Sequence, residues 1–210
     1  MRMPYFLIGS CLLSLTAPTE GQEMVPDYFE ITDVIFNGDG CPPGSVDKNV
    51  AADRLSFSLI FRNYIAEAAP HLSPSDGRRA CQVTVNLRVP PGWRFAVAGF
   101  DYAGYMNLDE GIHAEHKTSY YYQATDKQGE FTNTKKGPQQ NPFHFQQDVK
   151  LHDKLWSSCE TKRALNIKTA IRVWNNDRTR YPNAAGVMGA DSLIGDFHDQ
   201  KWKLSWARCP

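Results

Sequence analysis

The sequence predicts an all-β protein, an antiparallel β-sandwich or jelly-roll-like single domain that is held together by disulfides. Three observations lead to this prediction. Several short segments alternate apolar and polar residues with a period of two, turn-forming residues separate these segments, and no segment has the pattern of a long amphipathic helix. The 13 prolines and 15 glycines are spread along the chain, as many separate turns require.

The N-terminus has the pattern of a secretory signal peptide. Arg2 precedes a short apolar run from Tyr5 to Leu15, and Gly21 offers a small residue for cleavage. We therefore expect residues 1–21 to be removed and residues 22–210 to form one secreted β domain. No run of the sequence approaches the roughly 20 apolar residues of a membrane span. Lys plus Arg equals Asp plus Glu at 23 each, so charge indicates no nucleic-acid partner.

The cysteines agree with export. Cys11 lies in the predicted signal, which leaves Cys41, Cys81, Cys159 and Cys209 in the mature chain. An even number of cysteines in an oxidising compartment predicts two disulfides. Three pairings are possible, and we favour Cys41–Cys209 with Cys81–Cys159, because the first bridge would join the two ends of the domain. Without C-x-x-C pairs the cysteines do not suggest zinc, and oxidised cysteines cannot act as nucleophiles.

The first third of the chain contains two predicted strands. Tyr28–Phe36 mixes aromatic and β-branched residues, and Asn37–Gly40 follows it as a turn. Leu55, Phe57, Leu59 and Phe61 alternate with Ser56, Ser58 and Ile60, which predicts the next strand. Tyr64–Ala69 has the composition of a short helical turn that ends at Pro70.

A longer extended region follows from Cys81 to Tyr122. Val83, Val85 and Leu87 lie on one face of a strand, and the turn signal Pro90–Gly92 ends it. A second strand follows this turn, and Tyr120–Tyr122 begins another.

The last third is more mixed. We expect Asp126–Asn141 to be a mobile hydrophilic loop. Leu165–Val173 alternates cleanly and predicts a strand. The other expected elements are an extended segment at Phe143–Leu155, a polar loop at Asn175–Gly186, a short strand at Asp191–Gly195, and a last strand with Trp202, Leu204 and Trp206 on one face.

An ordered set of short motifs resembles a known family. The motifs begin with Cys41–Val46, Phe61–Tyr64 and Arg79–Val83, continue through Val89–Gly92, Asp101–Tyr105, Tyr120–Tyr122, Trp156–Cys159 and Ala164–Ile167, and end with Trp206–Cys209. Together they resemble the secreted microbial and fungal family called "domain of unknown function 4360". The resemblance implies an extracellular β domain with four matched cysteines, and it implies no catalytic residues.

Aromatic residues are the candidate binding residues. Trp93, Tyr102, Tyr105 and Tyr121 could form a platform for a sugar or a partner protein, because aromatic rings bury a large area and keep a polar handle. The alternative is that individual rings fill the core. Since Tyr120 and Tyr122 share one face of a strand, Tyr121 lies on the other, and we expect Tyr121 on the exposed face.

Two other groups of residues suggest chemistry. Acidic residues between Asp101 and Glu115 could supply the carboxylate pair of a glycoside hydrolase. The segment from His113 to His116 could ligate a metal, although a strand would direct these two imidazoles to opposite faces. We interpret Asp109–His116 as a solvated loop and expect no metal and no cofactor.

The favoured function is therefore a secreted, non-catalytic protein that binds a host or cell-surface partner or a glycan, in the manner of a fungal effector or virulence factor. The first alternative is a secreted polysaccharide hydrolase that uses the carboxylates between Asp101 and Glu115. The second alternative is a structural protein of the cell wall or matrix.

Overall fold

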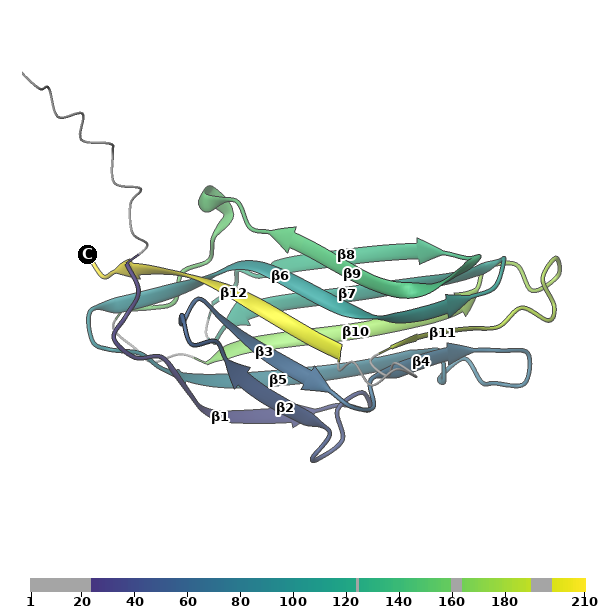
Figure 1. Cartoon of the computed structure of the whole chain (residues 1–210), viewed down its shortest axis with the longest axis horizontal. Coiled ribbons are helices and arrows are strands. Elements are labelled where there is room, and N and C mark those ends of the chain that lie inside the picture. The colour runs from purple at the N-terminus through teal and green to yellow at the C-terminus, as the bar shows by residue number, and fades with distance from the viewer. Residues whose placement is uncertain (1–23, 124, 160–163, 190–197) are drawn as a thin grey trace, which may run out of the picture.

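A computed structural model of the protein describes residues 24–123, 125–159, 164–189 and 198–210. These residues form two packed antiparallel β-sheets, so the predicted antiparallel β-sandwich is confirmed. The longest strands run roughly along the long axis of the molecule (Figure 1). Among the described residues we find no helix with the length and apolar character that a membrane crossing requires.

The first sheet, which we call sheet A, has five strands in the order β1-β5-β10-β7-β8. Each strand pairs antiparallel with its neighbours, so β10 is central, β5 and β7 flank it, and β1 and β8 are edges. The strands are β1 (Glu30–Asn37), β5 (Arg78–Arg88), β7 (Ile112–Tyr122), β8 (Gly129–Lys136) and β10 (Leu165–Asn175).

The second sheet, sheet B, has seven strands arranged around the long strand β6 (Trp93–Leu108). One side of β6 pairs first with β12 and then with β11, and the other side pairs with β9. The remaining elements are β2 (Val46–Val50), β3 (Ser56–Phe61), β4 (Ile65–Ala68), β9 (Gln139–Asp148), β11 (Gly186–Gly189), β12 (His198–Arg208) and the short 3-10 helix η1 (Leu151–Asp153).

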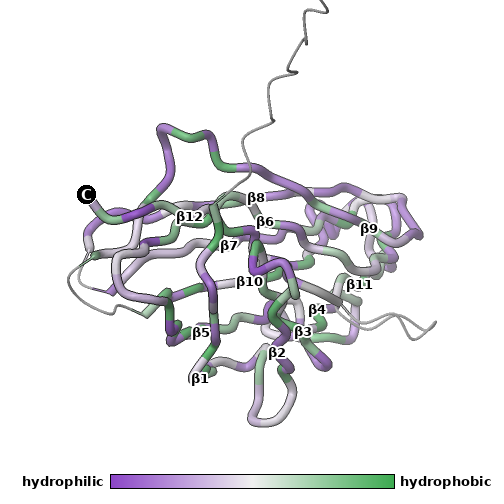
Figure 2. Tube along the Cα trace, turned by 60° about the vertical axis from the view of Figure 1, so that its left-hand side comes forward, coloured by the Kyte–Doolittle hydropathy of each residue, from purple (hydrophilic) through white to green (hydrophobic). Residues whose placement is uncertain are grey.

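The core lies between the sheets and receives alternate side chains from both. Figure 2 shows hydrophilic and hydrophobic residues interspersed along the strands, as this alternation requires. Trp202 of β12 and Phe100 of β6 are fully buried, with ring centroids 4.8 Å apart. Tyr120 of β7 packs edge-on against Trp202 from the other sheet. The two sheets therefore share one continuous aromatic core.

The disulfides join Cys41 to Cys81 and Cys159 to Cys209, so the pairing that we favoured from the sequence is wrong. The physical reason is strand order. Cys81 lies in β5, whose neighbour is β1, and Cys41 follows β1 closely. The second disulfide is explained in the same way. Trp156, three residues before Cys159, pairs through its backbone with Ala96 of β6, and β6 also pairs with β12, which ends just before Cys209. Each bridge thus joins segments that sheet pairing already brings together.

Two local predictions are also wrong. Most of the expected mobile loop Asp126–Asn141 is extended: strand β8 pairs with β7 and buries Phe131, and β9 begins at Gln139 and pairs with β6 in the other sheet. The expected helical turn at Tyr64–Ala69 contains the strand β4, which pairs with β11. The expected short strand at Asp191–Gly195 lies outside the described residues.

Candidate binding face

The outer face of sheet A is the side that is turned away from the core. Along β7, and along β10 from Ile167 to Trp174, buried residues alternate with residues that are partly or fully exposed, because successive strand side chains point to opposite faces. We define the outer face by the outward residues of its three inner strands: Arg78, Ala80, Gln82 and Thr84 of β5, His113, Glu115, Lys117, Ser119 and Tyr121 of β7, and Asn166, Lys168, Ala170, Arg172 and Trp174 of β10.

Tyr121 lies at one end of this face. Its neighbours Tyr120 and Tyr122 are buried in the core, whereas Tyr121 is partly exposed. The ammonium group of Lys168 lies 5.5 Å from the centre of the Tyr121 ring. Asn166 is the register partner of Tyr121, and its Oδ1 accepts a hydrogen bond of 2.8 Å from the Thr84 hydroxyl. An aromatic ring and a cation are thus adjacent on this face, next to the buried amide of Asn166.

Trp174 lies at the other end of the face. The guanidinium of Arg172 lies 4.7 Å from the centre of the Trp174 ring, within the range of a cation–π contact. His113 is the register partner of Trp174, and their ring centroids are 5.4 Å apart. Burial and the nearby charge of Lys136 lower the pKa of His113. The second cluster therefore repeats the ring-and-cation arrangement of the first.

Positive charges gather at the Trp174 end. Arg172 is the register partner of Arg78, and both side chains are exposed. Neither arginine forms an ion pair with another described residue, whereas Lys117 in the middle of the face is paired with Glu130 at 2.9 Å. Like charges on directly opposed residues of a β-sheet destabilise it. On its other side Arg172 is the register partner of Glu115, and no ion pair joins their side chains.

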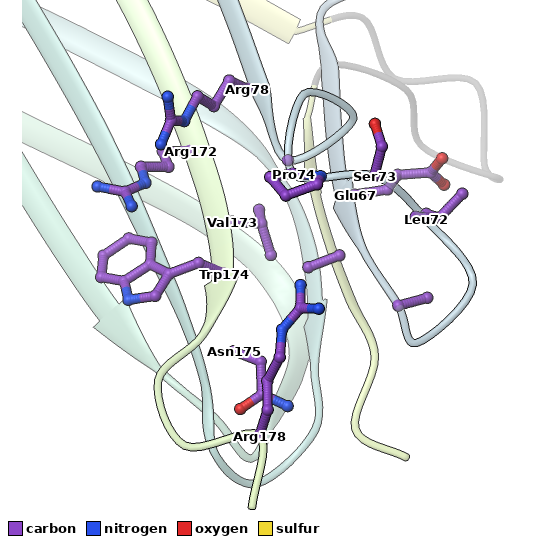
Figure 3. Close-up of a pocket in the computed structure, with 13 residues that line it drawn as sticks. Glu67, Leu72, Ser73, Pro74, Arg78, Arg172, Val173, Trp174, Asn175 and Arg178 are labelled. Carbon is purple, nitrogen blue, oxygen red and sulfur yellow. The ribbon is translucent and has the colours of Figure 1, made fainter. Parts of the chain in front are cut away.

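A hollow borders this end of the face (Figure 3). Residues from β4, β5, β10 and the adjoining loops line it, among them Ser73, Arg78, Arg172 and Arg178. Figure 3 shows Arg78, Arg172 and Trp174 extending on one side of β10, with Glu67 and Ser73 across the hollow on the opposite side. The arginine pair therefore faces outward beside the tryptophan.

The structure separates the four aromatic residues that the sequence suggested. Tyr121 lies on the outer face of sheet A, whereas Tyr105 is half-buried in sheet B. Trp93 is only 7% exposed, and the guanidinium of Arg208 lies 4.0 Å from the centre of its ring. The suggestion that Tyr102 is a binding residue is wrong. Its exposure is 0%, because its ring packs against His116 and Phe143 in the core. These rings form no common platform.

The segment Asp109–His116 is not the solvated loop that we expected, because strand β7 begins at Ile112. The strand directs His113 outward and His116 into the core, where His116 is fully buried. No group of three or more metal-ligating side chains is present in the part of the chain that the structure describes.

The carboxylates of the alternative hydrolase are also held apart. Asp101, in sheet B, forms an ion pair of 3.2 Å with Lys203. Asp109 accepts a hydrogen bond of 2.9 Å from the amide of Ala185, and Glu110 accepts one of 3.0 Å from the hydroxyl of Tyr181. Both carboxylates therefore bind the turn between β6 and β7 to the segment before β11. Glu115 lies on the outer face of sheet A. Asp101 and Glu115 thus lie in different sheets, and Asp109 and Glu110 are each bound to a partner of their own.

Sequence reasoning missed Trp174. We ended the expected strand at Val173, but β10 continues to Asn175. The signal was present, since Trp174 continues the outward series of Lys168 and Arg172 with the same period of two.

A comparison with protein families gives a match over nearly the whole described chain. Residues 27–209 match the family model described as "Domain of unknown function (DUF4360)". The chain belongs to this family. The resemblance inferred from the motifs is therefore confirmed.

Two further comparisons give context for the family assignment. An "Uncharacterized secreted protein" of the fungus Arthroderma benhamiae is 34% identical over 184 residues, which are 88% of this chain and 73% of the relative. The protein described here is likewise secreted and has two disulfides of the extracellular type. A solved structure of TmCBM61 in complex with β-1,4-galactotriose overlaps 86% of this chain and 91% of its own, with 8% identity and a TM-score of 0.25. A TM-score this low supports no conclusion about ligand.

Proposed function

We propose that this secreted protein binds an extracellular glycan on the outer face of sheet A and carries out no catalysis there. The observation that carries the proposal is the pair of ring-and-cation clusters, Lys168 with Tyr121 and Arg172 with Trp174. The partly apolar faces of sugar rings pack on aromatic side chains, and sugar hydroxyls need hydrogen-bonding partners beside them.

The length of the outer face suits an extended oligosaccharide. Asn166, beside Tyr121, and Trp174 are eight positions apart on β10, which corresponds to roughly 26 Å at about 3.3 Å per strand residue. Between the two clusters, Ala80 and Ala170 are register partners with short side chains. Polar groups that could bind sugar hydroxyls border this interval at Gln82 and Ser119. An oligosaccharide that lies along β10 would contact both clusters at once.

The test is binding of the purified mature protein to a glycan array, followed by calorimetry with the best ligand. We expect Tyr121→Ala and Trp174→Ala each to weaken binding by more than about 1 kcal/mol. Tyr105→Ala is the matched control, because it removes a half-buried tyrosine from sheet B. Equal loss in all three variants, or no loss in the first two, would contradict the proposal.

The site of action is part of the same proposal. We propose that residues 1–21 are removed on export, so that N-terminal sequencing of the secreted protein should begin at Gln22. The secreted fungal relative supports action outside a fungal cell, on the fungal wall or on a host surface. An effector or virulence role requires action on a host surface. Binding to isolated fungal walls, compared with binding to isolated host surfaces, distinguishes the two places of action.

A further inference from the structure

We propose that the glycan carries carboxylate groups, as a uronic acid polymer does, and that Arg78 and Arg172 bind one of these groups together. This inference rests on the glycan-binding function proposed above and specifies the chemical class of the ligand.

The first argument is the position of the two arginines. They are direct cross-strand partners on an exposed face, in a pairing that brings two positive charges together at a cost to the sheet. Two other exposed arginines have acidic partners: Arg88 at the end of β5 pairs with Glu30, and Arg62, which follows β3 in sheet B, pairs with Asp47. Glu115 of β7 is the other register partner of Arg172, but no ion pair joins these two side chains, and no ion pair among the described residues includes Arg78. An anionic ligand would supply the missing charge.

The second argument is the chemistry of the guanidinium group. Its planar array of N–H donors matches the two oxygens of a carboxylate, and such bonds are shorter and stronger than those between neutral groups. Stacking on Trp174 at 4.7 Å restricts the Arg172 side chain before any ligand arrives. Restricting a side chain in advance lowers the entropy lost on binding. A sugar ring beside the tryptophan would bring its carboxylate to the arginines.

The third argument is the balance of charge over the face. The chain as a whole is neutral, with 23 basic and 23 acidic residues. On the outer face as defined above, the basic residues are Arg78, Lys117, Lys168 and Arg172, and the acidic residue is Glu115. Lys117 is already paired with Glu130, which belongs to β8. The other three cations lie beside the two aromatic rings or opposite each other, so the binding face is positive on a neutral protein.

The experiment compares four probes by calorimetry: polygalacturonic acid, its fully methyl-esterified form, a neutral β-glucan and dextran sulfate. Methyl esterification removes the charge and keeps the sugar backbone. The variants are Arg78→Gln, Arg172→Gln and Arg172→Lys, and Arg62→Gln is the control because it removes one exposed arginine away from the face. Circular dichroism confirms that each variant is folded.

We expect polygalacturonic acid to bind best, with a loss of roughly tenfold or more on esterification and in Arg78→Gln and Arg172→Gln. Binding should weaken as salt increases. Arg172→Lys should recover only part of the affinity, since lysine keeps the charge without the planar donors. Arg62→Gln should bind as the wild type does.

Three results would overturn the inference. Equal binding to the acid and its ester, with loss only in Tyr121→Ala, would leave a glycan-binding protein whose ligand is neutral. Equal binding to dextran sulfate would show an attraction to negative charge without recognition of carboxylate. Failure of all four probes and of the glycan array would remove the glycan-binding function itself.

Discussion

The ring of His116 and the hydroxyl of Thr169 meet in the middle of the sandwich, with His116 Nε2 at 3.1 Å from Thr169 Oγ1. The two residues come from neighbouring strands, β7 and β10, and both are buried. The His116 ring is also stacked on Phe100 of the opposite sheet, with centroids 5.4 Å apart. A titratable group is thus enclosed by aromatic rings and hydroxyl groups, and none of the described residues places a charge beside it that would stabilise its protonated form.

The first prediction concerns stability against pH. Burial lowers the pKa of His116 from 6.5 to about 3, so between these values the unfolded chain binds a proton that the folded protein does not. This contribution leaves stability constant above pH 6.5 and reduces it as the pH falls towards 3, by roughly 4 to 5 kcal/mol at full extent. Urea unfolding measured from pH 3 to 8 tests this dependence.

A substitution isolates the histidine from the acidic residues that also titrate in this range. His116→Gln should flatten the slope of the free energy of unfolding between pH 3 and 6.5. His144→Gln is the control, because His144 is exposed on β9. An unchanged slope in His116→Gln would show that His116 does not cause the acid sensitivity.

The second prediction concerns Thr169, whose hydroxyl joins four side chains. It accepts hydrogen bonds from Tyr64 at 3.2 Å and from Gln200 at 3.1 Å, and it also contacts Thr118 and His116. Thr169→Val keeps the shape and removes these bonds, so we expect the free energy of unfolding to fall by roughly 2 to 4 kcal/mol. The same change at the exposed Thr132 should cost less than about 0.5 kcal/mol. Chemical denaturation of both variants provides the comparison.

The third prediction concerns the disulfides. A non-reducing peptide map should contain Cys41 linked to Cys81 and Cys159 linked to Cys209. The two disulfides close loops of 40 and 50 residues, so their entropic contributions to the free energy of unfolding should be similar. Replacing either pair with serine should lower the free energy of unfolding by roughly 2 to 5 kcal/mol. Linkage of Cys41 to Cys209 in the map would contradict the structure.

The fourth prediction concerns the turn after β1. Gly38 has a φ of 144°, and a Cβ at this position would collide with the backbone carbonyl of Ala80. The same turn is held to β5 by a hydrogen bond of 2.8 Å from the Ala80 amide to Asp39. Gly38→Ala should therefore destabilise the protein by roughly 1 to 3 kcal/mol or more.

Gly44 offers a matched control for this glycine. Its φ is also positive, at 81°, but apart from Gly44 and its two chain neighbours no described residue has an atom within 4 Å of a Cβ built there. Gly44→Ala should thus show the conformational cost alone, about 1 kcal/mol. If thermal unfolding shows the same loss of stability in the two variants, the contact with Ala80 does not contribute to the cost of Gly38→Ala.

Local pattern was sufficient to predict the strands that have one buried face. The alternation in β5 and β10 is nearly complete, because each of these strands separates the core from solvent. The edge strand β8 has one buried side chain, Phe131, and its remaining residues are polar, so its composition resembles that of a loop. Edge strands receive less of their stability from burial, so a prediction from composition alone can mistake an edge strand for a loop.

The candidate site was harder to predict because it depends on which strands are neighbours. The face that carries Tyr121 followed from a period of two, which is a local property. The burial of His116 depends on Phe100 and Tyr102, and the proximity of Arg78 to Arg172 depends on the pairing of β5 with β10. Such long-range pairings leave no periodic signal in either strand. The same limit explains the wrong cysteine pairing.

The order of the two bridges along the chain has a consequence for biogenesis. Cys41 pairs with Cys81 and Cys159 with Cys209, so the two closed loops follow each other and do not interleave. During vectorial export the N-terminal pair enters the oxidising compartment before either C-terminal cysteine, and it can close without competition from them. A chain with this connectivity can form both native bridges by sequential oxidation of nearest cysteines, without isomerase-catalysed reshuffling.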